Sequence, residues 1–294
     1  MKKFEGVFPA IITPLKEDES LNLTALEKLI EKTLAQGVSG FYVGGSTGES
    51  FLLPDGQRTE LIRAVCDIVR GRAGVIANIG TFSTSASIRM AEQAADAGVS
   101  AISAVPPFYF PYNKTEIKEY YYDIQRASGL PMIVYNVPKL SGVSFGTGEL
   151  EELLGHEGIA GIKQTTYDLY QTETLVRSFP GKSVFCGHDE IFLPALSVGV
   201  NAAIGSTFSI MADKFIEIRR QYQSGRLERA RALQGSVNQM IDVLLEVGIF
   251  KAIKGVLKLQ GIDCGDCKRP FKELTEADYK KLEQAMKILE EGNR

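Results

Sequence analysis

The chain has 294 residues, of which 44% are hydrophobic and 23% are charged, so it can bury a large core and is longer than a typical small domain. Its 33 basic and 36 acidic residues are spread without blocks and leave a net charge of −3, which gives no electrostatic footprint for nucleic acid or an anionic membrane. Four scattered cysteines argue against a disulfide framework. Glu5 and Pro9 make the opening MKKFEGVFPAIITPL unlike a signal peptide. No apolar run is as long as a membrane span, which needs about 18 residues. We therefore expect a cytoplasmic protein whose partner is a small molecule.

Eight short apolar runs recur along the chain, and amphipathic segments separate most of them. In the first such segment, LTALEKLIEKTLAQG, a helical period of apolar residues and a stop at Gly37 predict a helix. One face of that helix carries Leu26, Leu29, Ile30, Thr33 and Leu34. The runs, each short enough for a single buried strand, are GVFPAII (6–12), GFYVGG (40–45), GVIANIG (74–80), AISAVPP (101–107), PMIVYNVP (131–138), GIAGIKQ (158–164), SVFCG (183–187) and AAIGS (202–206).

The repeated alternation of strand and helix predicts an α/β fold, a (β/α)8 TIM barrel, over residues 1–225. A doubly wound sheet is the alternative, but it usually has fewer strands and a Gly-rich turn after the first one, where this chain has TPLKEDESLN. Beyond the barrel the sequence turns helical, so we predict a C-terminal helical domain over residues 226–294. The apolar face expected for its first helix consists of Leu227, Ala230, Leu233, Val237, Met240, Ile241, Leu244 and Leu245.

Polar side chains follow several of the predicted strands. Barrels of this class carry their chemistry at the C-terminal ends of the strands, so the order of the chain alone selects candidate residues. These candidates are Ser46 and Thr47 after the second run, Tyr109 after the fourth, Tyr135 within the fifth, Lys163 on the sixth, Asp189 and Glu190 after the seventh, and Ser206 and Thr207 after the eighth. We expect them to converge on one rim of the barrel.

The sixth run, GIAGIKQ, ends with an amine at Lys163 instead of another aliphatic side chain. Burial in a barrel disfavours the charged form of an amine, and the uncharged form is the one that attacks a ketone. The alternative is a strand-end lysine that extends into solvent. The apolar run before Lys163 and the phenol of Tyr135 on the neighbouring strand favour a nucleophile.

The stretch GGSTGE (44–49) combines glycines, which let backbone N–H groups approach a ligand, with two hydroxyls. It predicts a receptor for a carboxylate. The same letters match the G-x-S-x-G elbow of serine hydrolases, with Ser46 as nucleophile. That alternative is disfavoured, because Pro54 and Gly56 interrupt any immediate helix and neither His156 nor His188 occupies the late position that the hydrolase fold gives its base.

Two patterns could indicate a metal. The sequence C-G-D-C at 264–267 has the spacing of a metal knuckle, but no second Cys or His pair is near it, so we interpret it as a turn between helices. His188, Asp189 and Glu190 are adjacent, and adjacent residues seldom converge on one ion. Carboxylates that bind hydroxyl groups are the preferred interpretation, and no metal is predicted.

Three motifs at matching strand ends, GGSTGE (44–49), YNVP (135–138) and GIKQTT (161–166), resemble the N-acetylneuraminate lyase and dihydrodipicolinate synthase family of pyruvate-dependent class I aldolases. The likeness covers nearly the whole chain. It implies that Lys163 is the Schiff-base lysine, that Tyr135 is the catalytic phenol, and that Ser46 and Thr47 hold the pyruvate carboxylate. It implies no metal, nicotinamide or pyridoxal cofactor.

Within the family, the closer resemblance is to the branch that cleaves sialic acid, because GHDEIF (187–192) and GSTFSIM (205–211) look like the sugar-binding stretches of that branch. The synthases typically place an Arg where this chain has Leu140. The chain also departs from the branch at His188, a place often held by Tyr. The substrate contacts implied by the resemblance are Ser46, Thr47, Thr165, Gly187, Asp189, Glu190, Ser206 and Tyr109.

The implied reaction is the reversible retro-aldol cleavage of open-chain N-acetylneuraminate to N-acetylmannosamine and pyruvate. The aromatic loop PPFYFPYN (106–113) is too apolar to leave in water, and the resemblance implies a homotetramer in which Tyr109 reaches a neighbour's site. The alternatives are another aldolase of the family, either a 2-keto-3-deoxygluconate aldolase or a dihydrodipicolinate synthase, and a barrel that binds keto acids without catalysis.

Overall fold

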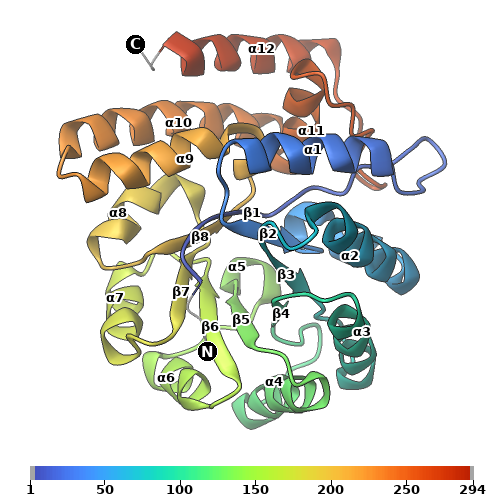
Figure 1. Ribbon diagram of the computed structural model, residues 1–294, viewed down its shortest axis with the longest axis vertical. Helices are drawn as coiled ribbons and strands as arrows, with labels where there is room; N and C mark the ends of the chain where they lie inside the picture. The colour runs from blue at the N-terminus through green and yellow to red at the C-terminus, as the bar shows by residue number, and fades with distance from the viewer. Residues whose placement is uncertain (1–3, 292–294) are drawn as a thin grey trace.

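The computed structural model describes residues 4–291 and shows eight parallel strands enclosed by helices (Figure 1). The strands are hydrogen-bonded in the order β1-β8-β7-β6-β5-β4-β3-β2, and a parallel bridge from Ala10 to Tyr42 brings the two edges together. The predicted (β/α)8 barrel is therefore confirmed, with a nearly closed sheet. The strands are β1 (Gly6–Pro9), β2 (Gly40–Val43), β3 (Gly74–Asn78), β4 (Ala101–Ala104), β5 (Met132–Asn136), β6 (Ile159–Gln164), β7 (Ser183–Cys186) and β8 (Ala202–Gly205).

Helices follow the strands around the barrel, as the alternating pattern predicts. The first begins where the Asn22 side chain accepts a hydrogen bond from the Ala25 N–H at 3.1 Å, and it ends just before Gly37, whose φ of +90° suits glycine. The helices of the barrel are α1 (Leu23–Ala35), α2 (Asp55–Val69), α3 (Thr84–Asp96), α4 (Lys114–Ser128), α5 (Pro138–Ser141), α6 (Thr147–Gly155), α7 (Leu169–Ser178), α8 (Phe192–Ser197) and α9 (Phe208–Gln223). Three short 3₁₀ turns, η1 (Ser46–Gly48), η2 (Ser50–Leu52) and η3 (Asp189–Ile191), lie at strand ends.

The strands separate two apolar layers because successive side chains point to opposite faces. On β2, Phe41 packs in the layer between strands and helices, whereas Tyr42 packs in the barrel interior. On neighbouring strands, Tyr135 and Lys163 are paired in register. The interior is filled by Phe8, Ala10, Tyr42, Ile76, Ala101, Val105, Ile133, Tyr135, Val137, Ala160, Phe185, Ala202 and Ile204.

Three further helices, α10 (Leu227–Val247), α11 (Ile249–Leu259) and α12 (Glu276–Glu291), form the C-terminal part, and α10 packs beside α9 (Figure 1). Most of the predicted face of α10 is buried, but Leu227 and Leu245 are exposed, and the expectation of burial was wrong for both. The proposed boundary between residues 225 and 226 falls between α9 and α10. The division into two domains stays a prediction. Cys264 and Cys267 lie in the connection between α11 and α12, as expected.

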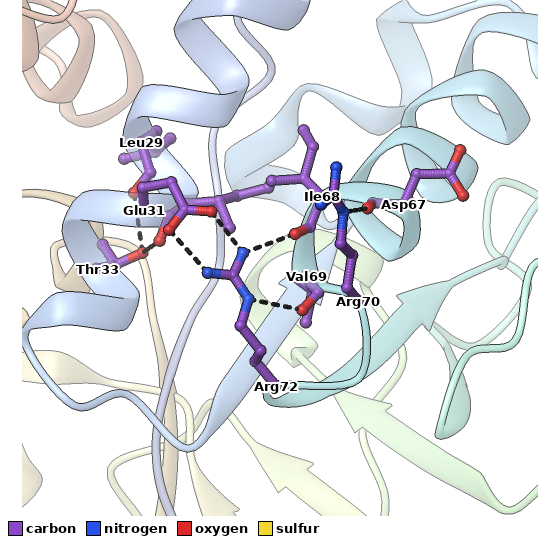
Figure 2. Close-up of polar contacts among 9 residues, drawn as sticks. Leu29, Glu31, Thr33, Asp67, Ile68, Val69, Arg70 and Arg72 are labelled. Atoms are coloured by element: carbon purple, nitrogen blue, oxygen red, sulfur yellow. Dashed lines mark hydrogen bonds and ion pairs between the residues drawn. The ribbon is translucent and has the colours of Figure 1, made fainter.

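The loop between α2 and β3 is joined by polar contacts to α1 and to the last turn of α2, as Figure 2 shows. Helix α2 ends at Val69, and the left-handed φ of 51° at the next residue, Arg70, turns the chain. The Arg72 guanidinium then pairs with Glu31 of α1 and donates to the last-turn carbonyls of Ile68 and Val69 at 2.7 and 3.0 Å. In the described residues, every helix is too short or too polar to cross a membrane.

Candidate active site

Lys163 on β6 is 5% exposed, and its amine lies among aromatic rings and not in solvent. Its Nζ is 4.1 Å from the ring centroid of Tyr135 on β5 and 4.8 Å from that of Tyr42 on β2. The two rings are nearly perpendicular, with centroids 6.0 Å apart. The arrangement presents a buried primary amine against the faces of two phenol rings, which suits a nucleophile that forms a Schiff base.

Tyr42 is the main residue of this cluster that the sequence did not reveal. Its hydroxyl donates to Ser103 Oγ at 3.1 Å, and burial raises the pKa of Tyr42 well above its usual value. The phenol therefore stays neutral, and its ring covers one side of the Lys163 amine. Its signal was its place in GFYVGG, two residues before the polar turn GGSTGE begins at Gly44.

The turn 44–49 lies at the end of β2 and carries the predicted carboxylate receptor. Thr47 is buried, and its Oγ1 is 2.7 Å from Ser206 Oγ, so hydroxyls from the ends of β2 and β8 meet. The Glu49 N–H closes the turn on the Ser46 carbonyl at 3.0 Å. Gly44 has φ +67°, and a Cβ there would lie 3.2 Å from the Asn78 carbonyl oxygen, so both conformation and space favour glycine.

The serine-hydrolase alternative does not fit this turn. Ser46 begins a three-residue 3₁₀ turn and not the long helix of a nucleophile elbow. His156 stacks on Tyr122 beyond the end of α6, with ring centroids 4.1 Å apart. His188 directs its Nδ1 to Glu190, 3.2 Å from Oε1, as a general base could, but among the described residues no hydrogen bond joins its ring to the Ser46 hydroxyl.

Asp189 stands on η3 after β7, and its carboxylate binds the chain after β8. Its Oδ2 accepts hydrogen bonds from the Thr207 N–H at 2.9 Å and the Thr207 hydroxyl at 2.7 Å. Burial raises the pKa of Asp189 to about 6, and the hydrogen bonds from Thr207 limit that rise. Asp189 therefore ties the β7 and β8 turns together and is also placed at the cavity wall.

Glu190 is the neighbouring carboxylate, and donors surround one of its oxygens. Tyr167 donates to Oε1 at 2.6 Å, and His188 lies 3.2 Å from the same oxygen. Burial opposes ionisation, but the hydrogen bonds from His188 and Tyr167 outweigh it and lower the pKa of Glu190 to about 2. The same bond raises the pKa of Tyr167 to about 12. Tyr167 and His188 stack at 4.3 Å between centroids, which gives His188 a defined place beside the carboxylate.

A family model described as the dihydrodipicolinate synthetase family matches residues 3–289. The chain belongs to this family. The N-acetylneuraminate lyase of Rhizobium meliloti (strain 1021) is 39% identical over 285 residues, which are 97% of this chain and 95% of the relative. A crystal structure of CdNal from Clostridium difficile in complex with mannosamine has a TM-score of 0.94 at 32% identity and covers 99% of both chains. That of N-acetylneuraminate lyase from Fusobacterium nucleatum complexed with pyruvate has a TM-score of 0.92 at 33% identity and covers 97% of both.

In this member of the dihydrodipicolinate synthetase family, one cavity of about 270 Å³ collects nearly all the predicted residues. The exception is Tyr109, which is 84% exposed on the loop between β4 and α4 and is absent from the lining of its own chain's cavity. Thr165 Oγ1 is buried there without a hydrogen-bond partner in the described residues. The predicted residues in the lining are Ser46, Thr47, Tyr135, Lys163, Thr165, Gly187, Asp189, Glu190, Ser206 and Thr207.

The C-terminal helices of this family member also line the cavity, which the sequence did not indicate. Ile241 and Leu245 come from α10, and Ile249 and Phe250 from α11. The exposure of Leu245 is thereby explained, because it faces the cavity and not the core. The cavity thus has the Lys163 amine at the end inside the barrel and the carboxylates of Asp189 and Glu190 at the opposite end, after β7. Apolar residues of α10 and α11 form one of its walls.

Proposed function

We propose that this chain is a class I aldolase, a carbon–carbon lyase that reversibly cleaves N-acetylneuraminate into N-acetylmannosamine and pyruvate. The observation that carries the proposal is the amine of Lys163, buried against Tyr135 in a cavity that also presents Asp189 and Glu190. The relative from Rhizobium meliloti, named N-acetylneuraminate lyase and 39% identical over 97% of this chain, supports the same substrate.

The covalent steps use Lys163 and Tyr135. The Lys163 amine attacks the C2 ketone of the open-chain sugar acid and, with loss of water, forms an iminium ion. The iminium takes up the electron pair of the breaking C3–C4 bond while Tyr135 helps to move the proton of the C4 hydroxyl, and N-acetylmannosamine leaves as the aldehyde. The enamine on Lys163 is then protonated at C3 and hydrolysed, which releases pyruvate and restores the amine.

The binding residues divide by charge and position. Ser46 and Thr47 offer hydroxyls to the pyruvate carboxylate, and the ionised Glu190 offers acceptors to the hydroxylated chain. Leu140 lines the cavity beside Lys139 and stands where the synthases of the family typically place an Arg, so the bidentate partner for a second carboxylate is missing. A site that hydrogen-bonds hydroxyls rejects substrates without them, because its own polar groups are left unpaired.

Two experiments test the proposal. Pyruvate with borohydride is expected to reduce a Schiff base onto Lys163 and inactivate the enzyme, and peptide mass mapping locates the adduct. A coupled assay of pyruvate release then compares N-acetylneuraminate with 2-keto-3-deoxygluconate, and condensation with aspartate semialdehyde tests the synthase alternative. Preference for the shorter sugar acid or for the semialdehyde would contradict N-acetylneuraminate as the substrate. No turnover of any keto acid would favour a barrel that binds keto acids without catalysis.

A homotetramer is part of the proposal. Tyr109 and Phe110 are 84% and 59% exposed, beside a cluster in which the Phe108 ring lies 4.6 Å from that of Phe82 and 5.0 Å from that of Phe51. So much exposed aromatic surface on one loop favours cover by a second copy, with Tyr109 reaching the neighbour's cavity.

Sedimentation velocity at micromolar concentration is expected to show a tetramer. Tyr109→Ala is expected to weaken assembly or activity, whereas Tyr170→Ala, which removes an 80% exposed tyrosine from α7, serves as the matched control. A wild-type monomer would contradict the assembly and favour a loop that folds over its own barrel.

The proposed location is the cytoplasm. The four cysteines, Cys66, Cys186, Cys264 and Cys267, are free thiols in the described residues, as suits a reducing compartment. Fractionation of cells that express the tagged chain tests this placement, and recovery in an oxidising compartment would contradict it.

A further inference from the structure

Polar side chains on the C-terminal helices reach the turns at both ends of the cavity. Gln234 on α10 is buried, and its Nε2 donates to the backbone carbonyl of Asp189 at 3.2 Å. Its Oε1 accepts from the Leu193 N–H at 2.9 Å, so the side chain links the first residue of η3 to the start of α8. The interaction is with backbone, which means that it acts on the position of the turn and not on a substrate.

Asn238 lies one helical turn further along α10 and also hydrogen-bonds the η3 backbone. Its Nδ2 donates to the carbonyl of Glu190 at 3.1 Å, and its Oδ1 accepts from Gln234 Nε2 at 2.8 Å. The carbonyls of both carboxylate-bearing residues are therefore held by two linked amides. A movement of either carbonyl would move the Asp189 and Glu190 side chains in the cavity.

Lys254 on α11 makes a corresponding contact at the other turn. Its Nζ lies 2.9 Å from Glu49 Oε1 and donates to the Asp266 carbonyl at 2.7 Å, while Glu49 Oε2 accepts from the Lys268 N–H at 2.6 Å. The side chains of Lys254 and Glu49 are 3% and 0% exposed. Buried ion pairs add little stability over apolar residues of similar size, and in some proteins their role is to specify one conformation.

The geometry fixed here is that of the carboxylate-binding turn. Glu49 adopts a left-handed φ of 59°, and its N–H closes the turn on the Ser46 carbonyl. We propose that Gln234 and Asn238 position the sugar end of the site, that Lys254 positions the pyruvate end through Glu49, and that the two ties act independently. The inference rests on the proposed function for its choice of substrates.

The sugar-end arm uses Gln234→Leu and Asn238→Leu, with Gln239→Leu on the exposed face of α10 as the matched control. The KM for N-acetylmannosamine in condensation with pyruvate is expected to rise about tenfold or more, because a misplaced turn loses its alignment with the substrate. The pyruvate concentration that gives half-maximal borohydride trapping is expected to stay within twofold of wild type, as are both quantities in Gln239→Leu.

The pyruvate-end arm uses the double variant Glu49→Gln with Lys254→Met, because Lys254→Met alone would leave a buried carboxylate unpaired. The amide oxygen of the new side chain still accepts from the Lys268 N–H. Half-maximal trapping is expected to need about tenfold more pyruvate, while the KM for N-acetylmannosamine at saturating pyruvate stays within twofold.

Equal shifts of both quantities in both arms would overturn the independence of the ties, and no shift in either arm would overturn the positioning roles. Circular dichroism checks folding, and if Gln234→Leu fails to fold, the half-buried Asn238 decides the sugar-end arm. Failure of the wild type to cleave N-acetylneuraminate contradicts the proposed function instead. The sugar-end arm is then measured with the aldehyde that the wild type does condense with pyruvate.

Discussion

At the reaction end of the cavity, Lys163, Tyr135 and Tyr42 all belong to strands, and their side chains lie in the packed interior of the barrel. At the sugar end, Asp189 and Glu190 stand on a three-residue 3₁₀ turn that depends on side chains from other elements for its position. In the proposed mechanism, the strand register therefore fixes the groups that do the covalent chemistry, whereas long-range hydrogen bonds to a short turn fix the groups proposed to select the substrate. Substitutions at the two ends should therefore fail in different ways.

The largest effect is expected at the reaction end. Lys163→Ala removes the nucleophile and should lower kcat by about 10³-fold or more, with no trapping of pyruvate by borohydride. Turnover of N-acetylneuraminate and mass mapping of the trapped protein are the measurements. Activity within tenfold of wild type would show that another group forms the intermediate.

Tyr135→Phe should come next, because it removes a proton-transfer group and leaves the ring that packs against the amine. We expect kcat to fall by about 10² or more, with a smaller change in affinity for the keto acid. Steady-state kinetics and pyruvate trapping separate the two quantities. An unchanged kcat would leave Tyr135 as a packing residue, and the chemistry would then need a different phenol such as Tyr42.

At the sugar end, Glu190→Leu should raise the KM for N-acetylneuraminate and spare trapping by pyruvate alone. The loss of a charge-assisted hydrogen bond, worth about 1.5–3 kcal/mol, corresponds to about 10- to 100-fold in kcat/KM. Glu190→Gln keeps an acceptor and serves as the milder matched variant. If both variants cleave the sugar acid within a few fold of wild type, Glu190 does not contact the substrate, and the difference between the two ends disappears.

The smallest expected effect is on the pH dependence of stability, which should differ between Asp189 and Glu190. Burial raises the pKa of Asp189 to about 6, so the native state binds its proton more tightly than the unfolded chain, and its contribution to stability falls as pH rises from about 4 to 6. The pKa of Glu190 is lowered to about 2, so its contribution is present above about 4.5 and is lost as pH falls toward 2.

Urea unfolding from pH 3 to pH 7 measures both effects. The stability of wild type minus that of Asp189→Asn should decrease as pH rises, whereas wild type minus Glu190→Gln should increase. Parallel pH profiles for the two variants would contradict the opposite environments of these neighbouring residues.

Sequence reasoning reached the reaction end because the strand pattern is local. Side chains alternate between the two faces of a strand, and parallel strands of a barrel end on the same rim. These two rules predict that Lys163, Tyr135, Ser46 and Thr47 lie at that rim, and neither rule needs a contact between distant residues. The contact of Tyr42 with Lys163 was not predicted, because an aromatic residue in an apolar run is interpreted as a core residue until its neighbours across the barrel are known. The strand pattern could predict that it faces inward, but not that it faces an amine.

The sugar end was harder to predict, because its geometry depends on contacts between residues far apart in the chain. The sequence placed Glu190 near the substrate, but nothing in GHDEIF indicates the stacking of Tyr167 on His188. The apolar period of α10 predicted burial for Leu245, whereas the packing of α10 over the barrel turned that side chain to the cavity. Gln234 was hidden by the same period, since a buried amide is recognised only through its partners.

The pairing of Glu49 with Lys254 also has a consequence for the order in which the protein is made. At about 5–20 residues per second, Lys254 leaves the ribosome on the order of 10 s or more after Glu49. By the end of that interval the nascent chain contains all eight strands and the Lys163 amine, but the Glu49 carboxylate still lacks its Lys254 partner. The turn proposed to hold the keto acid is therefore completed only when α11 docks, so the emerging polypeptide acquires the proposed nucleophile before it acquires a finished pocket.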